Sequence, residues 1–132
     1  SGDVLFLGKI PRLELYRYYS AADIFAFPGI QESLGMVYLE AQSSGLPVVA
    51  FRDWGAKEAV RHGITGLLSS AERPEEFCRD IEMLLTDRTK RIEMRNAAKD
   101  HIRNNHDSAR NYQAVNLTLQ NIVSSSLSMK DR

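Results

Sequence analysis

Apolar residues of this chain gather in short runs separated by helical patterns. The runs at 4–8, 24–29 and 47–51 are nearly continuous in apolar residues. Such runs predict strands that are buried on both faces of a parallel sheet. The segment "TGLLSS" at 65–70 predicts a further brief strand or extended stretch.

Helical patterns and helix-ending signals lie between these predicted strands. Pro11 can occupy the first turn of a helix. The apolar side of that helix is predicted to contain Leu13, Tyr16, Tyr19 and, less regularly, Leu15. A helix over about 34–43 is followed by Gly45, which suits a left-handed cap. A short helix over 56–63 is expected to end at Gly63.

The pattern becomes entirely helical from Pro74 onward. Helices are predicted over 74–87, 88–106 and 108–125, and residues 127–132 are expected to be frayed. The apolar face of the first of these helices is predicted to contain Phe77, Ile81, Leu84 and Leu85.

This order of elements predicts an α/β fold, a Rossmann-like parallel sheet with flanking helices and an all-helical tail. We expect residues 1–132 to form part of one domain, with a core over 3–87 and a helical tail over 88–126. A self-standing doubly wound domain usually has more than three or four strands. We therefore expect the chain to be a piece of a longer protein that continues at its N-terminal side.

Composition and charge narrow the function classes. Seventeen basic and seventeen acidic side chains cancel, so overall charge gives no argument for a nucleic-acid partner. The single cysteine, Cys78, excludes an internal disulfide and favours a reducing, cytoplasmic location. Its place in an amphipathic helix predicts a packed or half-buried thiol. No apolar run approaches the roughly 18 residues that a membrane span needs.

The segment "ESLGMVYLE" contains the main candidate for chemistry. Glu40 is the only charged side chain between Ser33 and Phe51. A carboxylate in apolar surroundings is costly to bury without a partner. The same segment follows a predicted strand and begins a helix, and ligands of open α/β sheets bind beyond the carboxyl ends of strands.

A phosphate followed by a sugar would fit this helix start. The N–H groups of about Gly35, Met36 and Val37 would be free donors, and Gly35 would let a ligand approach the backbone. Glu40 would lie about 7 Å further along the axis, where it could accept two vicinal ribose hydroxyls. Simpler interpretations stay open: Glu32 could complement the helix dipole, Ser33 could be an N-cap, and Glu40 could be solvated.

A longer stretch resembles a known family. "LYRYYSAADIFAFPGIQESLGMVYLEAQSSGLPVVAF" and "GAKEAVRHGITGLL" are similar to the C-terminal donor-binding domain of retaining GT-B glycosyltransferases, the "glycosyl transferases group 1" family. Glu32 and Glu40 have the spacing of that family's Glu–seven residues–Glu motif. The similarity runs from about Gly8 to Leu68.

The resemblance implies roles for individual residues. Glu32 corresponds to the catalytic glutamate that contacts the donor sugar, and Glu40 to the one that binds the ribose of the donor. Ile10 falls where the family makes main-chain contact with the base. The diphosphate would be held by the backbone of Gly35, Met36 and Val37. The resemblance implies a reaction that moves a sugar, expected to be a hexose, from a nucleotide-diphosphate sugar to an acceptor hydroxyl, with retention and without a bound metal or other cofactor.

The sequence also departs from the family pattern. Ser33 and Leu34 replace a frequent Gly-Phe pair, which could reshape the sugar pocket. The family's basic pair for the diphosphate and its N-terminal acceptor domain lie upstream of the motif, and Lys9 and Arg12 are in the wrong place to replace that pair. We therefore expect no transfer by this chain alone. The alternative function is a non-catalytic nucleotide-binding or assembly module.

Other candidates have simpler explanations. Trp54 could stack on a ligand, but a partly buried loop aromatic is commoner. Glu58 matches a frequent family glutamate and could equally be solvated. His62 is expected at a helix end, where a cation suits the dipole. The interval 88–110 holds seven basic and three acidic residues. It could meet an anionic membrane as a peripheral contact, although a solvated helical face is the commoner explanation.

Overall fold

The computed structural model describes residues 4–29 and 35–105 of the chain. Its sheet has three parallel strands in the order β1-β2-β3, which are Phe25–Phe27, Val48–Phe51 and Gly66–Ser69. Val48 is paired with Phe25 on one side and with Gly66 on the other. The predicted α/β class and the strands after residue 23 are thereby confirmed.

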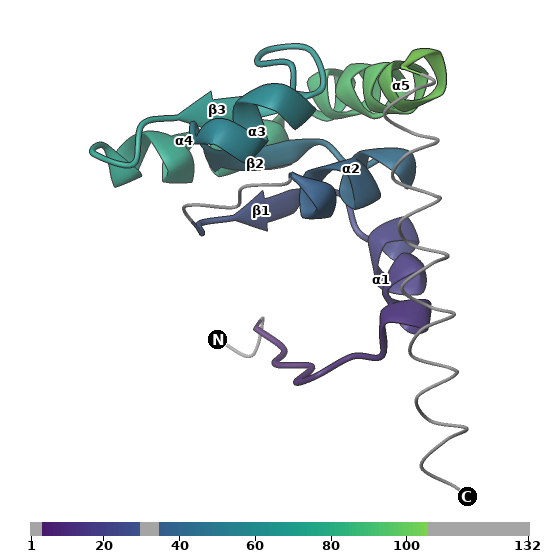
Figure 1. The fold of residues 1–132 in the computed structure, drawn as a ribbon. Coiled ribbons are helices and arrows are strands. Elements are labelled where there is room, and N and C mark those ends of the chain that lie inside the picture. Colours follow the sequence, from purple (N-terminus) through teal and green to yellow (C-terminus); the bar gives the residue numbers. More distant parts are fainter. Residues whose placement is uncertain (1–3, 30–34, 106–132) are drawn as a thin grey trace, which may run out of the picture.

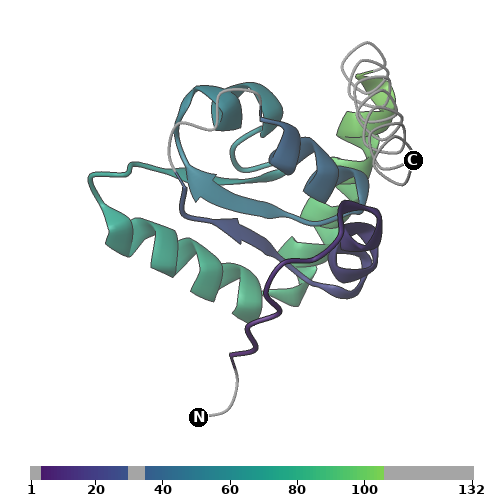
Figure 2. The same ribbon diagram turned by 60° about the horizontal axis from the view of Figure 1, so that its bottom comes forward.

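Helices cover both faces of this sheet (Figures 1 and 2). They are η1 (Arg12–Glu14), α1 (Leu15–Ala21), α2 (Met36–Ser43), α3 (Trp54–Ala59), α4 (Pro74–Thr86) and α5 (Arg88–Asn104). Figure 2 shows the sheet between α2 and α3 on one side and α4 on the other. The helices predicted from Pro74 and from residue 88 are confirmed within one or two residues, and the one predicted over 108–125 lies outside the described residues.

Alternating strand residues form two separate cores. Val48, Ala50 and Leu68 point to the side of α2 and α3, where they pack with Tyr38, Ala41, Ala56 and Ala59. Val49 and Leu67 point to the opposite side, where they pack with Phe77, Leu84 and Met94. This division follows from the two-residue period of a strand, which sends successive side chains to opposite faces.

Side-chain caps fix where two of the helices begin. The Asp53 carboxylate accepts a hydrogen bond from Ala56 N at 2.9 Å at the start of α3. The Asp87 carboxylate accepts one from Lys90 N at 3.0 Å at the start of α5. Gly45 follows α2 with φ +81°, so the predicted left-handed cap is confirmed.

The strand predicted at the beginning of the chain is wrong. Residues 4–7 are in an irregular, exposed segment, and Phe6 is 92% exposed. A strand is stable only when its backbone groups pair with a neighbour. Within the described residues the pairing partner of β1 is β2, and no strand lies along its other edge.

Several details of the helices also differ from the predictions. The third helix ends at Ala59 and not at Gly63, because Val60 is already extended. Cys78 is exposed, so the expected packed thiol is wrong. The predicted apolar faces included Leu13, Tyr16 and Leu85, all three of which are largely exposed.

Candidate functional site

Helix α2 begins at the carboxyl edge of the sheet. The chain leaves β1 at Phe27 and enters α2 at Met36, after Gly35. Gly35 has φ +63° and ψ +13°, in the left-handed region that favours glycine. A Cβ placed there would lie 2.7 Å from the Gly55 carbonyl oxygen and 3.2 Å from Ala59 Cβ. Gly35 is therefore required for the close packing of α2 on α3, apart from any contact with a ligand.

The first turn of α2 contains Met36 and Val37, two of the three residues whose backbone N–H groups were predicted as donors to a ligand. The Gly35 carbonyl accepts from Tyr38 N at 3.1 Å and from Leu39 N at 3.2 Å. No acceptor among the described residues is assigned to the N–H groups of Met36 and Val37, as expected for the first turn of a helix. These groups lie on the edge of the sheet where ligands of α/β proteins bind.

Glu40 is half-buried on α2 and meets α1. The Tyr19 hydroxyl donates a hydrogen bond to Glu40 Oε2 at 3.4 Å. That distance is long for an O–H···O bond, whose usual length is about 2.7–2.8 Å. The sequence assigned Tyr19 only to an apolar helix side, because local periodicity carries no sign of its contact with a residue 21 positions away.

Gln42 is a second residue whose role was not predicted. It is fully buried, and its Nε2 donates to Tyr38 O at 3.0 Å and to Ala59 O at 2.8 Å. The second bond joins α2 to the last residue of α3. Together with the Gly35 contact, it holds α2 in one position against its neighbour. A polar residue one turn after Tyr38, on the same side of the helix, was the available signal.

The ligand-binding roles predicted for these residues and for the other site residues remain predictions. Glu32 lies outside the described residues. Ile10 is half-buried in the irregular segment that leads into η1 and α1, so it adjoins the helix whose Tyr19 contacts Glu40. Glu58 is exposed on α3. The described residues contain no group of three or more His, Cys, Asp or Glu side chains that could hold a metal ion.

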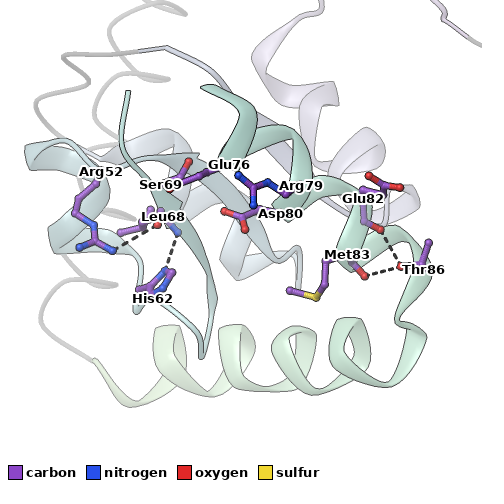
Figure 3. A pocket seen from close by; sticks show the side chains of 10 residues that line it. All are labelled: Arg52, His62, Leu68, Ser69, Glu76, Arg79, Asp80, Glu82, Met83 and Thr86. Atoms are coloured by element: carbon purple, nitrogen blue, oxygen red, sulfur yellow. Dashed lines mark hydrogen bonds between the residues drawn. The ribbon is translucent and has the colours of Figure 1, made fainter. Parts of the chain in front are cut away.

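A cavity of about 730 Å³ lies between the end of β3 and α4 (Figure 3). It is lined by Arg52, His62, Leu68, Ser69, Glu76, Arg79, Asp80, Glu82, Met83 and Thr86. Three carboxylates and three basic side chains share this lining, so its charge favours no particular class of ligand. Neither Glu40 nor Gly35 contributes to it.

Two side chains of this cavity, His62 and Asp80, have contacts that can be described individually. His62 Nδ1 accepts a hydrogen bond from Leu68 N at 2.9 Å, so the expected role of His62 at a helix end is wrong. It covers an N–H of the edge strand β3. Burial raises the pKa of the Asp80 carboxyl, the charge of Glu76 adds to that rise, and the charges of His62 and Arg79 oppose it.

The fold and the position of α2 define a class of protein. A parallel sheet with helices on both faces, and a glycine-started helix at its carboxyl edge, is typical of Rossmann-like nucleotide-binding domains. The sequence model of the family "Glycosyl transferases group 1" matches residues 1–101. The chain belongs to this family, as its sequence resemblance predicted.

Individual relatives agree with this assignment. The chain is 46% identical over 98 residues to the D-inositol 3-phosphate glycosyltransferase of Corynebacterium aurimucosum, covering 74% of this chain and 23% of that protein. It is 43% identical over 100 residues to the protein of the same name from Corynebacterium glutamicum, covering 76% of this chain and 24% of the relative. The chain thus spans about a quarter of the length of these relatives. Among the described residues, no helix is long and apolar enough to cross a membrane.

Proposed function

We propose that this chain is the donor-binding part of a retaining glycosyltransferase that uses a nucleotide-diphosphate sugar. The observation that carries the proposal is the position of α2. Its first turn presents the N–H groups of Met36 and Val37 at the carboxyl edge of the sheet, and half-buried Glu40 follows on the same helix. Family membership supports the same ligand class.

The diphosphate would bind at the beginning of α2. Backbone N–H groups and the positive end of the helix dipole favour an anion there. Negative charge grows on the diphosphate as the bond to the sugar breaks, so donors fixed in advance stabilise the transition state more than the ground state. The packing of Gly35 against Gly55 and the Gln42 bonds to α3 would keep these donors in place.

The ribose would bind to Glu40. Two vicinal hydroxyls can donate to one carboxylate, and such charge-assisted bonds offset the cost of its partial burial. The Tyr19 hydroxyl donates to Oε2 of this carboxylate and so helps to orient it. Ile10 would contact the base through its main chain, on the side of α1.

Glu32 would stand beside the donor sugar. Positive charge develops on the sugar ring in an oxocarbenium-like transition state, and a nearby carboxylate stabilises it. The acceptor would be held by another part of the whole protein, since the chain spans 23% of the length of the first relative described above. We expect the chain alone to bind nucleotide without transferring sugar, and measurable turnover by it would contradict that expectation.

Calorimetric titration with UDP, GDP and ADP tests the binding proposal. At least one nucleotide should bind, and Glu40→Ala should weaken that nucleotide by tenfold or more, because the ribose loses its charged acceptor. Glu93→Ala is the matched control, since Glu93 is an exposed glutamate on a different helix, α5. Equal affinities for wild type and Glu40→Ala, or binding of none of the three nucleotides, would favour a non-catalytic assembly module.

A further inference from the structure

A second cavity lies at the opposite edge of the sheet from the start of α2. It has a volume of about 300 Å³ and is lined by Ala22, Asp23, Gly45, Arg88, Arg91, Ile92 and Arg95. Asp23 shortly precedes β1 and Gly45 shortly precedes β2, so both lie at the amino ends of parallel strands. Helix α5 forms the other wall. None of these residues takes part in the donor site proposed above.

Positive charge dominates this cavity. Arg88, Arg91 and Arg95 follow one another at spacings of three and four residues, which places them on one face of α5. Asp23 is the one acidic residue of the lining. The ion pair assigned within α5 joins Arg103 to Asp100, near the other end of the helix. Within the described residues, neither Arg88 nor Arg95 is assigned an ion pair, so their charges are available to a ligand.

Two features hold arginine side chains in the cavity wall without any ligand. Arg91 Nη1 donates to the carbonyls of Leu84 at 2.9 Å and Leu85 at 3.0 Å, which holds its guanidinium at the end of α4. A Cβ at Gly45 would lie 3.2 Å from Arg95 Cγ and 2.6 Å from Lys99 Cε. The bare glycine therefore lets the stem of Arg95 lie against the loop before β2.

We propose that this cavity binds a phosphate monoester group. Guanidinium groups match phosphate through paired, charge-assisted hydrogen bonds, and several of them together favour a dianion over a single negative charge. A volume of about 300 Å³ equals roughly ten times the share of one water in the liquid, enough for a phosphate with a small attached group. The phosphate could belong to a free small molecule or to a lipid headgroup.

The larger cavity beside α4 lacks such a positively charged lining, because acidic and basic side chains are equal in number there. The difference between the two cavities supplies an internal control. Phosphate should affect the residues around Gly45 and Arg95 and leave those around His62 and Asp80 unchanged.

Titration with inorganic phosphate at constant ionic strength, followed by amide NMR of the full 132-residue chain, tests the proposal. Saturable shifts should appear in the loops before β1 and β2 and in the first half of α5. Arg88→Gln combined with Arg95→Gln should weaken binding at least tenfold. Arg103→Gln, on the same helix but already paired with Asp100, is the matched control and should bind as wild type does.

Asp23→Asn should change the phosphate affinity in the opposite direction from the arginine variant. The carboxylate of Asp23 repels an anion in the cavity, so its removal should tighten phosphate binding about fivefold, as expected for loss of roughly 1 kcal/mol of repulsion in water. Dispersed spectra of each variant establish that it is folded. Unchanged affinity in the double arginine variant, or shifts confined to the start of α2, would overturn the proposal.

Vesicles distinguish the two sources of phosphate. Phosphatidic acid carries a phosphate monoester, whereas phosphatidylglycerol carries a diester. Co-sedimentation with phosphatidic acid vesicles, absent with phosphatidylglycerol at matched surface charge and lost in the double arginine variant, would identify a lipid headgroup. Phosphate binding without co-sedimentation would identify a free phosphate ligand. Absence of both would overturn the site.

Discussion

The two edges of the sheet differ in how completely their strands are buried. Strands β2 and β3 are buried along nearly their whole length, between α2 and α3 on one face and α4 on the other. Strand β1, at the other edge, is only half-buried, and α1 beside it contains no buried residue. The apolar segment 4–7 is exposed next to that side.

This difference teaches that apolar content and burial are separate properties of a segment. The runs at 4–7 and 48–51 are equally apolar, but one is irregular and the other is a strand. Val48 has a strand on each side and a helix layer on each face, whereas Phe6 has neither. If the comparison is right, substitutions around β2 and β3 should cost much more stability than those around residues 4–7.

The largest expected effect is in the core beside α4. Leu84 is fully buried, and Leu84→Ala should lower the free energy of unfolding by about 2–5 kcal/mol through lost burial and a remaining cavity. The neighbouring Leu85 is 59% exposed, so Leu85→Ala should change the free energy of unfolding by less than about 0.5 kcal/mol. Denaturant unfolding of both variants measures the contrast, and equal losses would contradict the assignment of the helix face.

The next effect concerns the packing of α2 on α3. Gly35→Ala and Gly63→Ala both place alanine at positive φ, which costs about 1–2 kcal/mol. Only Gly35→Ala also brings a Cβ to 2.7 Å from a backbone carbonyl oxygen, whereas nothing lies within 4 Å at Gly63. Gly35→Ala should therefore be the more destabilising of the two in the same unfolding assay. A greater loss in Gly63→Ala would show that α2 is not held closely against α3.

A smaller effect depends on pH. Burial lowers the pKa of His101 below 6.5, the charge of Arg61 lowers it further, and the Ala59 backbone acts in the opposite direction. Because the folded state prefers the neutral imidazole, its stabilising contribution is complete above about pH 6.5 and is lost as the pH falls below that value. Unfolding at pH 7.5 and 5.5 should show this loss, and His101→Gln should reduce it. An identical pH dependence in that variant would count against the buried environment of His101.

The smallest effect on stability is expected in the exposed segment 4–7. Phe6 is 92% exposed, so Phe6→Ser should leave the free energy of unfolding within about 0.5 kcal/mol of wild type. The same denaturant experiment checks it at two protein concentrations. A decrease of more than about 1 kcal/mol in the free energy of unfolding would show that Phe6 is packed in solution. Segment 4–7 would then differ less from strands β2 and β3.

Local sequence patterns predicted most of the fold but less of the candidate site. The strands at 25–27, 48–51 and 66–69 were recognisable because each apolar run is bounded by glycine, proline or polar residues. Helix α4 was recognisable from Pro74 and its apolar spacing. The pattern failed at residues 4–7 because it carries no information on whether a neighbouring strand exists.

The position of α2 and of Glu40 on it could be predicted, but its surroundings could not. The approach of Gly35 to Gly55, the Gln42 bond to Ala59 and the Tyr19 bond to Glu40 join residues far apart in sequence. Such contacts depend on the packed arrangement of three helices, which no spacing within one segment encodes. For the same reason, the arginine-lined cavity was visible in the sequence only as a basic helix.

A crystal structure of the chain with the nucleoside diphosphate that binds most tightly would test the central claim most directly. The account predicts diphosphate oxygens about 2.7–3.2 Å from the backbone nitrogens of Met36 and Val37, and ribose hydroxyls in similar contact with the Glu40 carboxylate. A nucleotide bound in the cavity beside α4, or between α5 and the loops before β1 and β2, with Glu40 untouched, would contradict it.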